Sequence, residues 1–428
     1  MTFGPLPRYL TVCAAVSFPV GLSIAPGVLL FTERGVPLAA VAGLVAAHAM
    51  TTALLELPTG GLADALGRRW VLVAALVLSG VALTTQGLGT SIGVLTAGMV
   101  LAGAAGALAS GPAEAWYVDA ERRRAPDGDL RTGLARGSAV ASLSMGAGIL
   151  AGGALPWLVA GGLADRLETG TGGMVLPLSV PLLVGAAINL GCAGYVVSAL
   201  REPPRPAAAR STALAGVLAA VLGGLRLSSR DGVVRRVMLS AVASGAALVT
   251  LEVLAPGRAA SATGLAESGA LLFALLTCGG LLSHAGGGLL APPVGRALGS
   301  GERALLAGQS GSTVGMLLIA ATALSSGVLP SGLALFGYAL VYLGQGVGDP
   351  NAAALLHRRV PEANRATAVS LESLALRTSG ALMALLVTRL PSGYGPWGAA
   401  ALAMLAGALV WVRRTARDAA GPAPSAAR

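Results

Sequence analysis

Two acidic residues and a pair of arginines stand close together in residues 56–69, between two long apolar stretches of the chain. The segment reads Glu-Leu-Pro-Thr-Gly-Gly-Leu-Ala-Asp-Ala-Leu-Gly-Arg-Arg. Its glycines permit a tight turn and a close approach of helices, and an acid beside arginines can form a charge-assisted network that breaks and re-forms. Gly60, Asp64, Gly67, Arg68 and Arg69 can therefore build such a breakable network at the membrane edge. The alternative for the arginines is simple anchoring at a membrane edge, which we favour for Arg69.

A second segment contains residues that could do chemistry. It is 110–119, which reads Ser-Gly-Pro-Ala-Glu-Ala-Trp-Tyr-Val-Asp. Pro112 can break a helix here, and Glu114 is the first acid after a long apolar run. A carboxylate kept away from water can bind and release protons near neutral pH, so Glu114 and Asp119 are candidates for proton coupling or substrate binding. Alternatively, Glu114 lies at the membrane interface and pairs with an arginine such as Arg136.

The other charges inside the apolar stretches are few: Glu252, Asp349, Glu372 and Arg377. Glu252 lies close to the predicted outer end of its block, where water can reach it, and the other three are candidates for proton coupling or substrate binding. Asp349 precedes Pro350, and this pair favours either a broken helix that exposes polar groups or a simple kink. Glu372 and Arg377 can pair with each other or serve a structural pairing that fixes their helix. We interpret His48 and His284 as hydrogen-bonded structural residues, although histidine titrates near neutrality.

The sequence contains no motif for several kinds of chemistry. We see no phosphate-binding loop, no metal-ligand spacing and no pair of nucleophile and base, so we expect no enzyme activity, no bound metal and no cofactor. The three cysteines lie in separate apolar stretches without a paired spacing, which argues against a disulfide framework. Any energy for work would then come from an ion gradient, and a proton gradient is our expectation.

The elements that must position these residues are membrane-spanning helices. The chain is 54% hydrophobic and 11% charged, with a mean hydropathy of +0.75. A soluble protein carries about 25% charged residues, so this chain needs lipid as its solvent. Apolar blocks of about 20 residues match the thickness of a bilayer's hydrocarbon core. We place twelve such blocks at 9–31, 37–57, 70–89, 92–116, 133–159, 175–199, 237–256, 268–290, 304–326, 331–355, 367–389 and 395–412.

The basic residues indicate how these helices are oriented. All 29 are arginine, and with the N-terminus inside, only Arg34, Arg166, Arg258 and Arg389 fall on the opposite side. This asymmetry predicts that both termini are cytoplasmic, with the first block retained as a span. The net charge of +10 then reflects contact with the lipid bilayer, not with nucleic acid. The use of arginine without lysine, with abundant Ala and Gly, favours the plasma (inner) membrane of a bacterium.

The longest polar interruption divides the chain into two parts of six blocks each. We predict an N-terminal half at 1–200, a cytoplasmic central loop at 201–236 with a possible interfacial helix, a C-terminal half at 237–413 and a disordered tail at 414–428. A constant displacement also aligns Gly60 with Gly288 and Arg68 with Arg296, which is a faint internal repeat.

Residues 60–69 resemble the signature Gly-x-x-x-Asp-x-x-Gly-Arg-Arg of the major facilitator superfamily, at the place where that family carries it. The resemblance implies an all-α membrane fold of two six-helix halves. It also implies that residues 56–69 are a gating segment, namely a cytoplasmic latch in which Asp64 and Arg68 contact neighbouring helices and stabilise the outward-facing state. The segments 56–60 and 111–116 are similar to a bacterial branch of drug:proton antiporters in this family.

Two departures from that branch concern its fourth and fifth spans. The branch's exporters often have an arginine inside span four, but residues 99–110 contain none. Span five contains Gly148, Gly152 and Gly153, similar to the exporters' Gly-Pro-x-x-Gly-Gly, with Ile149 in place of proline. Close helix packing explains these glycines equally well.

The resemblance implies a secondary-active exporter of small, lipophilic compounds that exchanges them for protons by alternating access, and we expect it to act as a monomer. The first alternative is an importer or uniporter for a metabolite, favoured by the absence of an arginine in span four. The second is a membrane sensor or scaffold that transports nothing and binds a partner through residues 201–236.

Overall fold

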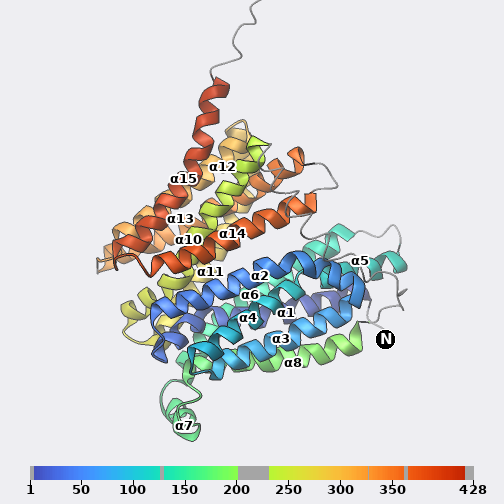
Figure 1. The fold of residues 1–428 in the computed structure, drawn as a ribbon, viewed down its shortest axis with the longest axis vertical. Helices are drawn as coiled ribbons and strands as arrows, with labels where there is room; N and C mark the ends of the chain where they lie inside the picture. The colour runs from blue at the N-terminus through green and yellow to red at the C-terminus, as the bar shows by residue number, and fades with distance from the viewer. Residues whose placement is uncertain (1–3, 126–129, 201–230, 326, 361–364, 420–428) are drawn as a thin grey trace, which may run out of the picture. The chain divides into compact units, whose positions relative to one another are not determined.

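The computed structural model describes residues 4–125, 130–200, 231–325, 327–360 and 365–419, and within them the side chains of 57–65, 131, 365–367 and 413–419 are not described. The described chain is helical throughout (Figure 1). Its elements are α1 (Pro5–Glu33), α2 (Leu38–Leu66), α3 (Arg68–Leu88), α4 (Ile92–Ala109), α5 (Pro112–Arg124), α6 (Leu130–Val159), α7 (Gly162–Gly170), the 3-10 helix η1 (Pro177–Ser179), α8 (Val180–Ala199), α10 (Gly232–Thr263), α11 (Ala266–Ala297), α12 (Gly301–Ala321), α13 (Val328–Arg359), α14 (Arg365–Val387) and α15 (Tyr394–Ala419).

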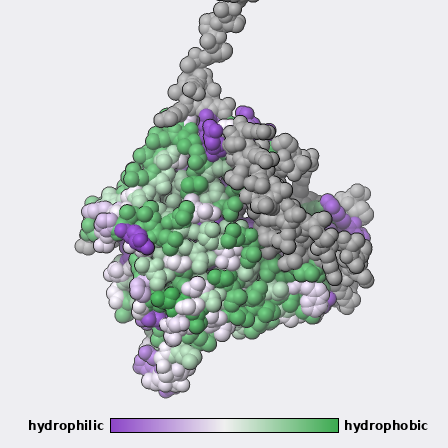
Figure 2. All heavy atoms as spheres, viewed as in Figure 1, coloured by the Kyte–Doolittle hydropathy of each residue, from purple (hydrophilic) through white to green (hydrophobic). Residues whose placement is uncertain are grey.

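Twelve helical segments in the described residues are long and apolar enough to cross a membrane, which confirms the predicted number of spans. Large apolar side chains lie exposed along these helices, as Leu143 of α6 and Leu289 of α11 do. Figure 2 shows apolar residues over most of the coloured surface of one face, with strongly hydrophilic residues in a few separate patches. Such a surface is stable in hydrocarbon and would be unfavourable in water.

The structure corrects the prediction at two places. Residues 413–419 belong to α15, so the predicted disordered tail begins too early, because alanine and arginine favour continuation of a helix. Residues 420–428 lie outside the described part. The sequence also gave no indication of α7, a short helix without buried residues that extends away from the other helices of its unit (Figure 1).

The chain forms two compact units, and each is described by itself. Unit 1 comprises residues 1–218 with 252–278, and unit 2 comprises 219–251 with 279–428. Most of the predicted central loop at 201–236 lies outside the described residues. The predicted division into six-helix halves therefore stays a prediction.

Glycines bring α1 and α6 together in unit 1. A side chain on Gly148 would meet the backbone of Phe18 and Gly21 in α1, and one on Gly152 would meet the backbone of Leu22. Gly153 faces a different neighbour, the Ala270 and Ala274 region of α11. These contacts are the close packing that small residues allow between membrane helices.

Replacing Gly148 with alanine is therefore expected to destabilise the protein by about 2 kcal/mol, because the added methyl group strikes backbone atoms that cannot rotate away. Gly146 provides the matched control, since a side chain there would meet no atom within 4 Å. Thermal unfolding in detergent should show a lower midpoint for Gly148→Ala and an unchanged one for Gly146→Ala. Equal midpoints for the two variants would show that α1 and α6 are not packed as described.

Arg34 caps the C-terminal end of α3 in unit 1. Its Nη1 donates to the carbonyls of Gln86 (3.0 Å) and Gly89 (2.6 Å), and its Nη2 donates to Met174 O (3.1 Å) and Ser179 Oγ (3.1 Å). Burial lowers the pKa of the guanidinium, and the nearby Glu33 carboxylate opposes that shift. The last carbonyls of a helix lack partners within the helix, so Arg34 satisfies them and joins the ends of α1 and α3 to the segment before α8.

A buried polar cluster joins four helices of unit 2. Ser244 of α10 donates its hydroxyl hydrogen to Gln345 Oε1 of α13 (2.8 Å), and Gln309 Nε2 of α12 lies 3.5 Å from the same hydroxyl oxygen. Gln345 Nε2 lies 4.0 Å from the sulfur of Met404 in α15. Since hydrocarbon offers no hydrogen bonds, such a cluster links helices that apolar packing alone would leave less specific.

Candidate functional site

The first candidate site lies in unit 1 where the fourth span is interrupted. α4 ends at Ala109 and α5 begins at Pro112, so the helix break expected at Pro112 is present. Gly111 between them has a φ of 91°, a left-handed conformation that favours glycine. Pro112 occupies the first turn of α5, where its missing N–H costs no helical hydrogen bond.

Two tyrosines dock α5 onto the rest of unit 1. Tyr117 of α5 stacks on Tyr9 of α1 with ring centroids 4.7 Å apart and ring planes 13° from parallel. Both side chains are buried. Gly133 and Gly137 of α6 leave the space that the rings fill, since a side chain at either position would collide with Tyr117 or Tyr9. The stack holds the polar face of α5 in a fixed place.

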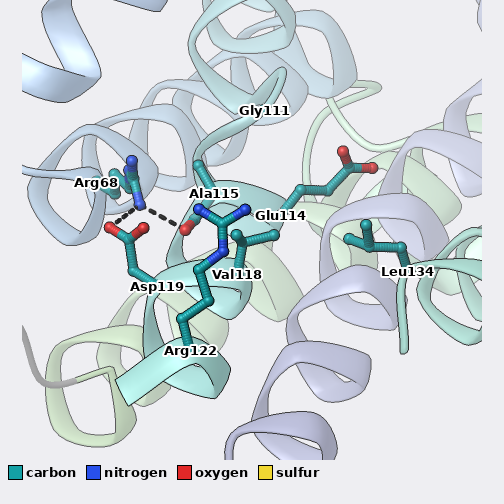
Figure 3. Close-up of a pocket in the computed structure, with 8 residues that line it drawn as sticks. All are labelled: Arg68, Gly111, Glu114, Ala115, Val118, Asp119, Arg122 and Leu134. Carbon is teal, nitrogen blue, oxygen red and sulfur yellow. Dashed lines mark hydrogen bonds and ion pairs between the residues drawn. The ribbon is translucent and has the colours of Figure 1, made fainter. Parts of the chain in front are cut away.

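Arg68 connects the start of α3 to that polar face. Its Nη1 forms an ion pair with Asp119 and donates a hydrogen bond to the Ala115 carbonyl, both in α5 (Figure 3). The Arg68 side chain is 15% exposed and the Asp119 side chain 42%. The structure thus joins a residue of the predicted gating segment to a residue predicted for coupling. Sequence reasoning named both residues without pairing them.

Asp119 and Arg68 line a cavity of about 410 Å³, together with Gly111, Glu114, Ala115, Val118, Arg122 and Leu134. Glu114 is exposed in this cavity, and Figure 3 shows its side chain pointing away from the Arg68–Asp119 pair. This exposure favours the alternative of a Glu114 near the membrane interface over that of a carboxylate kept away from water. Its position in the first turn of α5, where the helix dipole favours a carboxylate, explains why it need not be enclosed. The expected partner Arg136 forms no ion pair with it in the structure.

The rest of the predicted gating segment is helical and not a loop. α2 continues to Leu66, and the turn into α3 is made at Gly67, whose φ of 98° again favours glycine. The side chain of Asp64 lies outside the described part of the structure, so the role of Gly60 and Asp64 in a latch stays a prediction. The Arg69 guanidinium lies 5.0 Å from the ring centroid of Trp70, which fits its interpretation as an anchor.

In unit 2, the faint repeat does not reproduce this turn. Gly295 corresponds to Gly67, but it lies inside α11, which continues through Pro292 and Pro293 to Ala297. The left-handed glycine comes later, at Gly299. The two segments therefore correspond in sequence but differ in local structure.

A second charged group lies in unit 2, between α11 and α13. His284 Nε2 lies 2.9 Å from Asp349 Oδ2. α13 is unbroken at Pro350, which contradicts the broken-helix interpretation, because hydrocarbon strongly favours keeping the remaining helical hydrogen bonds. His284 is thus hydrogen-bonded, as predicted, and its partner is one of the predicted coupling residues.

The two remaining candidates lie on α14 and both are half-buried. Glu372 is within electrostatic range of Asp349. Arg377 Nε donates to Ser373 Oγ at 3.3 Å. Asp349 of α13 thus lies near ionisable side chains of two other helices, His284 of α11 and Glu372 of α14, which are distant from it in sequence.

Comparison with known proteins finds no matching family model and no matching curated sequence. Solved structures do match over nearly the whole chain. The nucleoside transporter NupG superposes with a TM-score of 0.71 at 13% identity, covering 97% of this chain and 99% of that one. A bacterial homologue of the human lysosomal transporter Spinster gives 0.69 at 16% identity, covering 96% and 94%. A peptide transporter, POT, gives 0.69 at 14% identity, with the same coverage.

At these identities the similarity establishes architecture and leaves substrate open. The structural neighbours are transporters of the major facilitator type, and the described residues of this chain contain twelve helical segments long and apolar enough to cross a membrane. The chain therefore has the all-α major facilitator fold of a multi-pass membrane protein, with twelve candidate spans among its described residues.

Proposed function

We propose that this chain moves a small solute across a membrane by alternating access. The observation that carries the proposal is the fold: three solute transporters share it over 96% or more of this chain. Such folds hold substrate near the middle of the membrane and expose it to either side by rocking of one part against another. A transporter differs from an inert helix bundle because it has polar contacts that can break during the cycle.

The Arg68–Asp119 pair supplies one such contact. It joins the first residue of α3 to α5, and α5 follows a glycine break. Breaking the pair would separate two charges beside a cavity of about 410 Å³ that is open to water, so the cost is modest and recoverable. We assign this pair the role of a latch that is closed in one state of the cycle.

The finer proposal is export of small, lipophilic compounds in exchange for protons. Its support is the similarity of residues 56–60 and 111–116 to drug:proton antiporters, together with carboxylates on membrane helices at Asp349 and Glu372. A carboxylate on such a helix is costly unless it serves a function. No ATP-binding motif offers another energy source.

A second candidate is import or uniport of a polar metabolite. One observation favours it: Glu114 is exposed at the α4–α5 break and is not enclosed within the bundle, and α4 contains no arginine. The usual coupling element of the exporters is therefore missing from the fourth span. The nucleoside and peptide transporters among the structural neighbours suggest the solutes to test.

Proteoliposomes distinguish the two candidates. Purified protein is reconstituted, and movement of each compound is followed with a pH gradient imposed or collapsed by an ionophore. The panel contains cationic and neutral lipophilic compounds, a nucleoside and a dipeptide. Antiport predicts accumulation of a lipophilic compound against its gradient only while the pH gradient exists. Equilibration of a nucleoside or dipeptide that ignores the gradient supports uniport, and no movement of any compound contradicts both.

A further inference from the structure

His284 and Asp349 form a hydrogen-bonded contact between two membrane-spanning helices, and this contact is an ion pair whenever His284 is protonated. His284 is on α11 and Asp349 on α13, and their Nε2 and Oδ2 atoms lie 2.9 Å apart. Histidine is the side chain whose charge normally changes between about pH 5 and 8. An imidazole held against a carboxylate can therefore gain or lose one proton at physiological pH.

The pair is also accessible. The His284 side chain is 42% exposed and the Asp349 side chain 62% exposed. Ionisable side chains in membrane helices avoid hydrocarbon and face water or protein, because exposing a charge to lipid costs several kcal/mol. We therefore expect this face of α11 and α13 to meet water at some stage of the cycle, which a proton carrier requires.

The backbones of α11 and α13 cross beside the pair at very close range. A side chain on Gly346 of α13 would strike the carbonyl of His284, and one on Gly287 of α11 would strike the carbonyl of Leu343. Because glycines lie at this crossing, the two helices pack closely and have little room to shift against each other. A change in the strength of the pair therefore acts directly on how α11 and α13 are held together.

Other charged groups lie on the surrounding elements. Glu372 of α14 is within electrostatic range of Asp349. Arg296 lies farther along α11, and Glu302 and Arg303 lie in the first turn of α12, where Arg303 donates to the Leu298 carbonyl at 3.2 Å. His357, Arg358 and Arg359 end α13. Within this set, Glu372 interacts electrostatically with Asp349, the carboxylate of the pair.

We propose that the His284–Asp349 pair is the proton-carrying site of the transport cycle, a role that deepens the proposed function and rests on it. With the proton bound, imidazolium and carboxylate attract each other and hold α11 against α13. When one proton leaves to water, neutral imidazole keeps only a weaker hydrogen bond to the carboxylate. No other bond forms or breaks, and the two states differ by one proton and one positive charge.

The test replaces each partner with a side chain that keeps a hydrogen bond and cannot titrate, namely His284→Gln and Asp349→Asn. His357→Gln is the matched control, because His357 is an exposed histidine at the end of the same helix as Asp349. Each protein is reconstituted with a pH-sensitive dye trapped inside, and two quantities are measured for a transported compound. One is the proton movement that the compound drives, and the other is its exchange across the membrane without any pH gradient.

The expected result is loss of proton movement in His284→Gln and Asp349→Asn with exchange retained, and wild-type values of both in His357→Gln. Retained exchange also proves that the variants fold, and if Asp349→Asn does not fold, His284→Gln decides alone. Wild-type proton movement in His284→Gln would overturn the assignment and leave the proposed antiport standing. Exchange without proton movement in the wild type would overturn proton coupling itself and the carrier with it.

Discussion

Replacing Arg68 with glutamine is expected to slow transport about tenfold or more, which corresponds to roughly 1.4 kcal/mol or more. The reason is that Arg68 both pairs with Asp119 and donates to the Ala115 carbonyl, and hydrogen bonds to charged groups contribute about 1.5–3 kcal/mol each. Glutamine is uncharged, and its side chain is too short to keep both contacts. The initial rate of compound movement into proteoliposomes measures the effect.

Two further variants test whether the ion pair itself is responsible. Arg122→Gln is the matched control, because Arg122 is an exposed arginine that lines the same cavity and has no ion-pair partner among the described residues. Its rate should stay near that of the wild type. Exchanging the two charges, with Arg68→Asp and Asp119→Arg in one protein, should recover part of the rate. A wild-type rate in Arg68→Gln would remove the latch from the account.

Replacing Tyr117 with alanine is expected to destabilise the protein by about 3–5 kcal/mol, the usual cost of deleting a buried aromatic ring. Tyr117 is 2% exposed and stacks on Tyr9, and its removal leaves a cavity beside Gly133. Since the stack docks α5, the Arg68–Asp119 contact should weaken as well. Thermal unfolding in detergent and the transport rate should therefore both decline.

Tyr117→Phe is the control for this variant, because phenylalanine keeps the ring and removes only the hydroxyl group. Most of the stability and transport should remain. If Tyr117→Ala unfolded at the wild-type temperature, the stack would not be what holds α5 in place. If the alanine and phenylalanine variants lost stability equally, the hydroxyl group and not the stacking would be the important part.

The spans themselves could be predicted from the sequence because a bilayer fixes the length of an apolar helix. For the same local reason, Pro112 indicated the break between α4 and α5. Local signals failed where a helix simply continues. α2 extends through the glycines of the gating segment to Leu66, and α13 continues through Pro350, because the lipid environment favours satisfied backbone groups over the preferences of single residues.

The candidate sites were predictable only as separate residues. Arg68 and Asp119 were each named from their charge, but their pairing depends on how α5 docks, and that depends on the Tyr9–Tyr117 stack. His284 seemed an isolated histidine because its partner Asp349 is on another helix. Contacts of this kind arise from tertiary packing, and neither hydropathy nor spacing along the chain encodes them. The uncharged cluster at Ser244 was missed because single polar residues barely alter a hydropathy profile.

The central claim is that this chain uses a proton gradient to move a small solute, and the internal pH of proteoliposomes tests it most directly. A pH-sensitive dye trapped in vesicles that contain the wild-type protein reports the internal pH while compounds are added outside. Protein-free vesicles and vesicles that contain Glu114→Gln are measured in parallel. The account predicts a pH change that depends on both the compound and the protein, and that persists in Glu114→Gln because Glu114 is exposed and the proton is carried elsewhere. Movement of compounds with no pH change in the wild type would contradict it.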